Sequence, residues 1–178
     1  MMIRTLSRWF EWLLEAASIV LLISLALVVV LAVLFRFSGS SLIWYDEVAS
    51  VQLAWLTYYG AALAALKRGH LGFAGLFLAL PPRVRSTAFV LGEVLVIGFF
   101  LMIGWAGWYL LGVFGEETLI SLPWMPLSFT QSVIPVGAAL FIVAEILSMP
   151  DAWRKAGAGT DFEKAAIEEA IEEARQSS

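Results

Sequence analysis

Four long runs of apolar residues, separated by charged or proline-containing segments, dominate the hydrophobic pattern of the chain. A helix needs roughly 20 apolar residues to cross a bilayer core about 30 Å thick, and every backbone polar group is then satisfied within the segment. The pattern therefore predicts an all-α integral membrane protein whose four transmembrane helices cover about residues 16–35, 48–66, 86–112 and 129–149. We expect these spans to form one membrane domain, residues 1–150, followed by a charged tail, residues 151–178.

Shorter segments fit the membrane surface better than its interior. Residues 3–15 place polar and apolar side chains on different sides at helical spacing, which predicts an interfacial helix leading into the first span. Residues 71–80 are apolar but would rise only about 15 Å as a helix, so they predict a second interfacial helix, ended by two prolines. Residues 161–175 are rich in alanine and glutamate, which favours an exposed helix in the tail with no specific role.

Lysine and arginine lie in segments that would face the same side of a membrane. They occur before the first span, between the second and third spans, and after the fourth, whereas the opposite side carries Arg36 as its one basic residue. Because cytoplasmic loops carry the excess of basic residues, we expect both termini to be cytoplasmic. The two interfacial helices would then lie along the cytoplasmic leaflet.

The composition narrows the class of protein further. Hydrophobic residues make up 61% of the 178 residues and charged residues only 15%, which excludes an ordinary water-soluble domain. Residues 161–178 hold six acidic and two basic residues, so they account for the whole net charge of −4 and leave no basic surface for nucleic acid. With no cysteine and one histidine, the chain lacks the residues for disulfides, thiolate metal sites or bis-histidine haem. We expect no cofactor, no metal site and no enzymatic activity.

Two acidic residues interrupt the apolar runs, Glu93 in the third span and Glu145 near the end of the fourth. An ionisable group inside a membrane is costly and by default suggests function. Both residues lie toward the predicted cytoplasmic side, where most basic residues gather, so structural ion pairs are the expected explanation. Ion or proton handling is the alternative for Glu93.

Polar residues also flank the outer ends of the first two spans. Arg36 ends the first span, and Asp46 and Glu47 precede the second, so a salt bridge closing this hairpin is expected. A lipid phosphate is the competing partner for Arg36, and capping of the second helix is the competing role for the two acids. Nothing near them resembles a nucleophile or a metal site, which argues against acid–base catalysis.

Several other residues indicate helix ends or packing surfaces. Gly69 suits the C-cap of the second span, and His70 after it is expected to be a capping or interfacial residue. For Pro135 in the fourth span we expect a merely structural proline, which membrane helices tolerate, and a functional kink is the alternative. Small residues at helical spacing permit another helix to approach closely, whether it belongs to this chain or to a partner. Such residues are Gly60 with Ala64 and Ala61 with Ala65 in the second span and, less regularly, Gly98, Gly104 and Gly107 in the third.

An ordered set of short motifs between residues 16 and 147 resembles the small membrane subunit of TRAP (tripartite ATP-independent periplasmic) transporters. The motifs are Arg36-Phe37, Trp44-Tyr45-Asp46-Glu47, Trp55, Gly60-Ala61-Ala62, Arg68-Gly69-His70 and Ile134-Pro135-Val136-Gly137. Family members often carry an acidic residue shortly after the histidine, whereas this chain continues with Leu71-Gly72-Phe73-Ala74-Gly75. That departure argues against a polar role for the predicted helix there.

The resemblance implies a non-catalytic subunit of a secondary uptake system in the bacterial inner membrane. In this family a periplasmic substrate-binding protein captures an organic acid, such as a dicarboxylate, and a large membrane subunit carries it inward by symport with an ion, usually sodium. The small subunit braces the large one. The residues that would contact these partners or membrane lipids are Arg36, Trp44, Asp46, Glu47, Trp55, Gly60, Arg68, His70, Glu93 and Pro135.

Two other classes of protein are compatible with the same hydrophobic pattern. One is an autonomous small proton-coupled carrier, in which oligomers would surround Glu93 as a membrane carboxylate. The other is a membrane anchor subunit of an enzyme complex, although a single histidine argues against haem ligation by this chain alone.

Overall fold

The computed structural model describes residues 2–68, 81–158 and 175. Within this part of the chain the structure is helical, with one isolated β-bridge, between Thr118 and Pro126, and no strand. The helices are α1 (Met2–Phe37), α2 (Tyr45–Leu66), α4 (Pro82–Val113), α5 (Leu127–Gln131) and α6 (Val133–Ala158). Four segments are long and apolar enough to cross a membrane, in agreement with the prediction: Leu6–Phe37, Tyr45–Leu66, Val84–Val113 and Leu127–Arg154.

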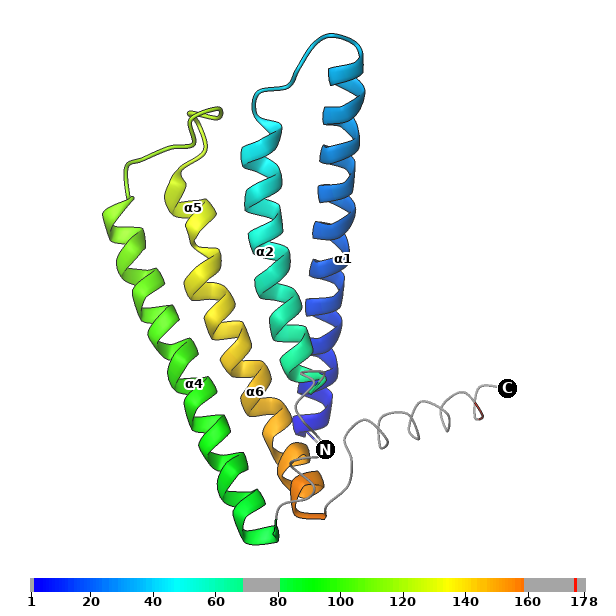
Figure 1. The fold of residues 1–178 in the computed structure, drawn as a ribbon, viewed down its shortest axis with the longest axis vertical. Helices are drawn as coiled ribbons and strands as arrows, with labels where there is room; N and C mark the ends of the chain where they lie inside the picture. Colours follow the sequence, from blue (N-terminus) through cyan, green and yellow to red (C-terminus); the bar gives the residue numbers. More distant parts are fainter. Residues whose placement is uncertain (1, 69–80, 159–174, 176–178) are drawn as a thin grey trace.

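The long helices stand side by side in one row (Figure 1). The order in the row is α1, α2, α6, α4: α2 packs against α1 and α6, and α6 packs against α2 and α4. The last long helix of the chain therefore inserts between the second and the third. α1 begins and α6 ends at the same end of the row, which we call the terminus end. The opposite end carries the α1–α2 and α4–α5 connections, and we call it the loop end.

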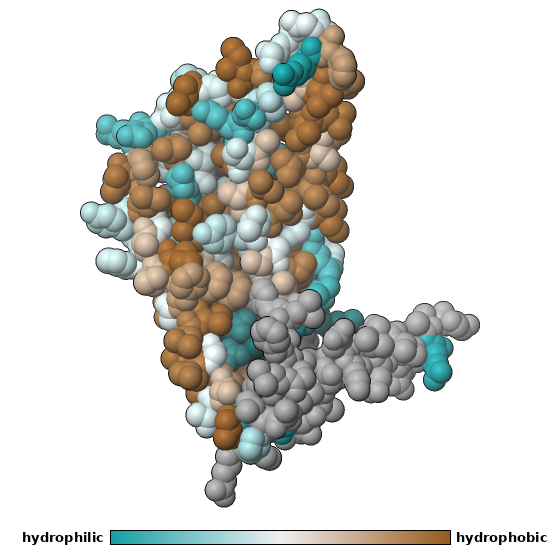
Figure 2. Space-filling model, viewed as in Figure 1, coloured by the Kyte–Doolittle hydropathy of each residue, from teal (hydrophilic) through white to brown (hydrophobic). Residues whose placement is uncertain are grey.

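Apolar side chains cover much of the outer surface of the row (Figure 2). Along α1 and α4, the large apolar side chains of Val20, Leu95 and Trp105 are more than 60% exposed. Lipid chains or another membrane protein match such a surface, whereas water does not. The helix α6, in the middle of the row, is the most buried of the four.

Buried side chains join the helices of the row. Phe100 of α4 stacks on Phe141 of α6, with ring centroids 3.6 Å apart. The helices diverge toward the loop end (Figure 1). The main hydrophobic core joins three of these helices, and its buried members are Phe10 and Leu14 of α1, Ala62, Ala65 and Leu66 of α2, and Phe141 and Ala144 of α6.

Two glycines let neighbouring helices approach closely. A Cβ on Gly137 of α6 would lie 2.5 Å from a ring carbon of Tyr58 in α2. A Cβ on Gly107 of α4 would lie 2.6 Å from a side-chain carbon of Ile134 in α6. Side-chain contacts that short do not occur, so each position needs a residue without a Cβ for the helices to keep their spacing.

The predicted small-residue pairs of the second span contribute unequally. Ala65 is fully buried, and so is Ala62 one turn earlier. A Cβ on Gly60, in contrast, would meet nothing within 4 Å, and the same holds for Gly98 of α4. Gly60 is therefore not a close contact between the described helices of this chain.

The fourth predicted span is divided near its start. α5 ends at Gln131, Ser132 interrupts the helix, and Pro135 lies in the first turn of α6. The N–H groups in the first turn of a helix have no acceptor inside the helix, so a proline there, which lacks an N–H, removes no helical hydrogen bond. Pro135 therefore lies where a helix begins, which agrees with the structural role expected for it, and the alternative of a functional kink inside the span does not fit this position. At its other end α6 continues past residue 150, to Ala158.

The two predicted interfacial helices have different outcomes. Residues 3–15 form the first part of the continuous helix α1, so they are not a separate element. Residues 71–80 lie outside the described residues, as does the predicted tail helix apart from Arg175.

Candidate functional site

Arg68 joins three helices at the terminus end of the row. It lies two residues beyond the end of α2, and its Nη1 atom donates to Oε1 of Glu93 in α4 at 2.5 Å and to Oε1 of Glu145 in α6 at 2.9 Å. Its Nη2 atom donates to the backbone carbonyl of Glu145 at 3.3 Å. We call these three residues the Arg68 cluster. One guanidinium thus connects the end of α2 to its neighbour α6 and, beyond α6, to α4.

The Arg68 cluster is shielded from solvent. Glu93 is 8% and Glu145 6% exposed. The guanidinium carbon of Arg68 lies 5.9 Å from the ring centroid of Phe89 in α4, which covers one side of the cluster. Charges in such surroundings are screened much less than charges in water. The ion pairs of the cluster are therefore screened less by water than the exposed ion pairs of Lys67 and Arg154.

The backbone turns sharply where α2 ends. Arg68 has a φ of 52°, in the left-handed region, which costs a residue with a side chain roughly 1–2 kcal/mol. The C-cap of α2 is Lys67, so the helix ends before Gly69, the residue that the sequence predicted as the cap. The ion pairs to two helices hold Arg68 in this conformation. Ser148 of α6 adds a second link, because its hydroxyl donates to the carbonyl of Ala65 in α2 at 3.3 Å.

The expected ion pairs of Glu93 and Glu145 are confirmed, and they share one cation. The sequence did not indicate this sharing, because Arg68 lies 25 residues before Glu93 and 77 before Glu145. His70, the other candidate in this region, lies outside the described residues.

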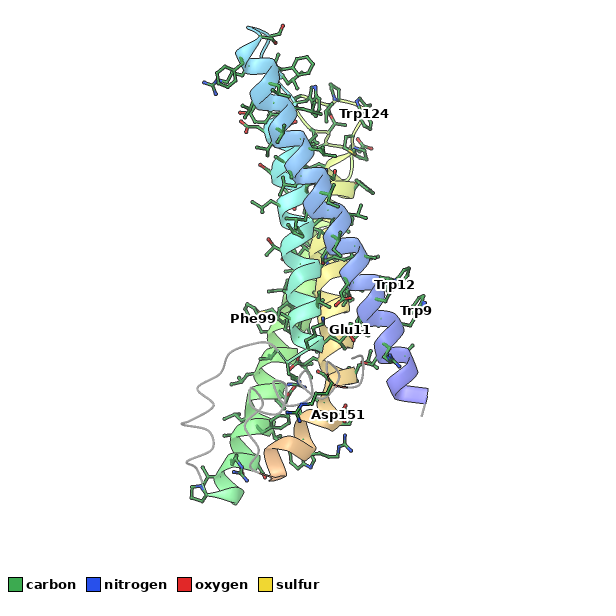
Figure 3. All side chains as sticks on the ribbon, turned by 90° about the vertical axis from the view of Figure 1, so that its right-hand side faces the viewer. Trp9, Glu11, Trp12, Phe99, Trp124 and Asp151 are labelled. Carbon is green, nitrogen blue, oxygen red and sulfur yellow. The ribbon has the colours of Figure 1, made fainter. Side chains whose placement is uncertain are left out.

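Lys67 connects α1 to α2 through exposed contacts. Its Nζ atom lies 2.5 Å from Oε1 of Glu15 and 3.2 Å from Oε1 of Glu11. The hydrogen bond to Glu15 is the main reason why the pKa of Lys67 lies above its usual value. Figure 3 shows Glu11 on the inner side of α1, while Trp9 and Trp12 point away from the row. Exposed pairs of this kind contribute at most about 1 kcal/mol, so this contact is weaker than the buried cluster.

Glu47 holds the segment between α4 and α5 at the loop end. Its carboxylate accepts hydrogen bonds from the backbone N–H of Ile120 at 3.2 Å, from the N–H of Ser121 at 3.0 Å and from the Ser121 hydroxyl. Hydrogen bonds to an ionised acceptor are roughly twice as strong as neutral ones. The first turn of α2 is thus tied to a segment more than 70 residues away in sequence.

Trp55 makes a second contact between the same parts of the chain. Its indole N–H donates to the carbonyl of Thr130 in α5 at 3.3 Å. Its ring stacks on Tyr59 of α2, with centroids 6.0 Å apart, and on Phe129 of α5, with centroids 5.7 Å apart. The structure therefore places Trp55, predicted as a partner or lipid contact, half-buried between two helices of its own chain.

The salt bridge expected between Arg36 and the acids before α2 is not among the ion pairs of the described residues. Glu47 binds the Ser121 segment instead, and Arg36 is exposed in the last turn of α1. Asp46 and Glu47 lie in the first turn of α2, where acidic groups complement the helix dipole, as the alternative interpretation proposed. Trp44, half-buried, is the N-cap residue of α2 and makes no side-chain capping bond.

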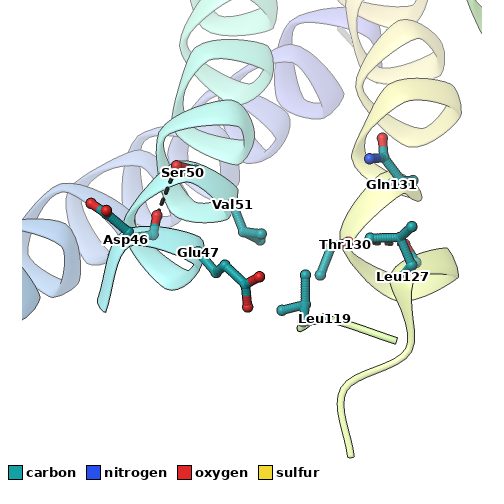
Figure 4. Close-up of a pocket in the computed structure, with 8 residues that line it drawn as sticks. All are labelled: Asp46, Glu47, Ser50, Val51, Leu119, Leu127, Thr130 and Gln131. Carbon is teal, nitrogen blue, oxygen red and sulfur yellow. Dashed lines mark hydrogen bonds between the residues drawn. The ribbon is translucent and has the colours of Figure 1, made fainter. Parts of the chain in front are cut away.

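A shallow groove of about 490 Å³ separates α2 from α5 at the loop end (Figure 4). A second hollow of about 310 Å³ shares part of its lining and extends along α2 to the start of α6. Among the described residues no three histidine or acidic side chains gather as a metal site. Sequence reasoning did not find the groove, because its walls meet only in the folded chain; they are Asp46, Glu47, Ser50 and Val51 on one side and Leu119, Leu127, Thr130 and Gln131 on the other.

Replacing Glu47 with alanine is expected to release the segment before α5. Without these hydrogen bonds to an ionised acceptor the segment should open more often, so the amide protons of Ile120 and Ser121 should exchange faster. The measurement is amide hydrogen exchange at Ile120 and Ser121 in the detergent-solubilised protein. Asp46→Ala is the matched control, because this neighbouring acid is exposed. Equal exchange in Glu47→Ala and wild type would contradict the assignment.

The row of four apolar helices, tied at both ends by polar contacts, defines a helical multi-pass membrane protein. Residues 25–155 match the family described as tripartite ATP-independent periplasmic transporters, DctQ component. This match covers well over half of the chain, so the protein belongs to that family and is a small membrane component of a TRAP transporter. The comparison with curated proteins found no match. The family is one of transporter components and is not known for catalysis.

Proposed function

We propose that this chain is the scaffold of a TRAP transporter that imports organic acids into a bacterial cell by symport with sodium. It holds the large membrane subunit in the inner membrane while a periplasmic binding protein delivers the substrate. Both of its termini lie in the cytoplasm. The family match supports the transporter and its kinds of partner, and the basic residues at the terminus end support the orientation.

The shape of the molecule carries the scaffold proposal. A carrier binds its substrate near the middle of the membrane, typically between broken helices. In the described part of this chain, the ionisable clusters lie at the two ends of the row, and the large apolar faces lie between them. Gln52 of α2 donates to Ser24 of α1 at 2.6 Å between the two ends, which ties these helices together. Helices held together at several points suit a scaffold for the large subunit better than a carrier, whose helices must move to pass a substrate.

The orientation can be tested with single cysteines, since the natural chain has none. Ser40→Cys lies in the α1–α2 connection, and Ser177→Cys lies in the tail. We expect a membrane-impermeant thiol reagent to label the first from the periplasm and the second only after the inner membrane is opened. The reverse pattern would overturn the proposed orientation.

The scaffold role is tested with the complete transporter. We expect the tagged chain to co-purify with the large membrane subunit, and uptake to disappear without this chain and return when it is supplied. Single cysteines at Val20 of α1 and Leu95 of α4 then report which exposed apolar face is covered by the large subunit, through cross-linking or loss of labelling. Uptake that persists without the chain would contradict the proposal, and transport by the chain alone in liposomes would favour the autonomous carrier.

A further inference from the structure

The Arg68 cluster holds more negative than positive charge. Nη1 of Arg68 bonds one oxygen of Glu93 and one of Glu145, so the two carboxyl groups lie close together around a single cation. With both ionised, the cluster would carry one surplus negative charge. Both acidic residues are more than nine-tenths buried, and an uncompensated charge at such a position is strongly unfavourable.

Each carboxyl group also has a second oxygen that lacks a hydrogen-bond partner. Oε2 of Glu93 and Oε2 of Glu145 are both buried and have no hydrogen-bond partner among the described residues, and the same holds for Nε of Arg68. Buried polar atoms are normally satisfied, and ionised oxygens most of all. A proton shared by the two carboxyl groups would satisfy both oxygens and cancel the surplus negative charge.

The ion pairs of the described residues give Glu93 and Glu145 one cation, Arg68. Arg85 of α4 is buried and has an interaction of its own, but it lies eight residues, or about 12 Å of helix, before Glu93. The charged groups of α1 and α6 nearest the cluster are engaged with one another or with α2: Glu11 and Glu15 with Lys67, and Asp151 with Arg154.

We propose that Glu93 and Glu145, held by Arg68, form a buried site that binds one exchangeable proton. The proton resides on one carboxyl group, which then donates its O–H toward the other, and the remaining negative charge is matched by the guanidinium. Arg68 is the most exposed member of the cluster, with 22% of its side chain exposed, so the path between the carboxyl groups and water leads past its guanidinium. This inference does not depend on the scaffold function.

The number of charges is tested by replacing the two acids singly and together. At neutral pH, Glu93→Gln and Glu145→Gln each leave one carboxylate for one guanidinium, so each variant should melt at the wild-type temperature. The double variant leaves Arg68 without a counter-charge and should melt several degrees lower. If a second cation balanced two ionised carboxylates, each single variant would melt lower as well, and that result would overturn the proposal.

The proton itself is observed by infrared difference spectroscopy of the full chain in lipid nanodiscs. We expect the wild type to show a protonated carboxyl band at neutral pH that disappears as the pH rises, and each single glutamine variant to lack it. His70→Gln is the control and should keep the band. A band lost in His70→Gln, or the absence of a band in wild type, would overturn the proposal.

Discussion

Replacing Arg68 with methionine is expected to lower the free energy of unfolding by about 3–5 kcal/mol, because it leaves two buried acids without their cation. Methionine keeps most of the side-chain length, so the loss reports the charge rather than a cavity. The measurement is thermal or denaturant unfolding of the purified chain in detergent, followed by tryptophan fluorescence. The effect should be large because Glu93 and Glu145 lie on different helices, and both then lose their link to α2.

Two further variants separate this electrostatic effect from a general one. Arg154→Met removes an exposed arginine whose partner, Asp151, is also exposed, and should cost at most about 1 kcal/mol. The triple variant Arg68→Met with Glu93→Gln and Glu145→Gln removes all three charges and should recover much of the lost stability. A single Arg68→Met protein that unfolds like wild type would show that the cluster does not hold the helices.

Replacing Gly137 with alanine is expected to destabilise the protein by about 1–3 kcal/mol through overpacking. The new Cβ would lie 2.5 Å from a ring carbon of Tyr58 and 2.6 Å from its Cβ. A ring can rotate away, but the Cβ of Tyr58 moves only with its backbone, so α2 and α6 must separate. The same unfolding measurement applies, and recovery of the complex with the large subunit should fall in parallel.

The matched control for this substitution is Gly98→Ala in α4. A Cβ there would meet nothing within 4 Å, and alanine favours a helix over glycine by up to about 1 kcal/mol, so stability should be unchanged or slightly raised. Gly60→Ala in α2 should behave likewise for the isolated chain. If Gly137→Ala were as stable as Gly98→Ala, the close approach of α2 and α6 would not be required.

These contacts explain how so thin a molecule keeps its shape. α6 lies between α2 and α4, and the Arg68 cluster joins all three at the terminus end. At the loop end, Glu47 and Trp55 tie α2 to the segment that precedes α6. The row is therefore held together at the terminus end and at the loop end. Its apolar faces stay exposed and available to lipid or to the large subunit.

The sequence alone was sufficient for the number and approximate position of the spans, because a bilayer demands long apolar helices whatever their neighbours are. It also indicated the family, from ordered motifs that the match over residues 25–155 confirms. The sequence also predicted that Glu93 and Glu145 would each pair with a basic group, since a charge buried in a membrane requires a partner.

Only the tertiary structure decided which groups meet. It showed that α6 inserts between α2 and α4, that one arginine serves two carboxyl groups, and that Glu47 binds the Ser121 segment and not Arg36. It also separated Gly137, which is pressed against Tyr58, from Gly60, which meets nothing nearby. Hydrophobic periodicity is a local property of a helix, whereas these contacts join residues 25 to 79 positions apart and depend on how whole helices pack.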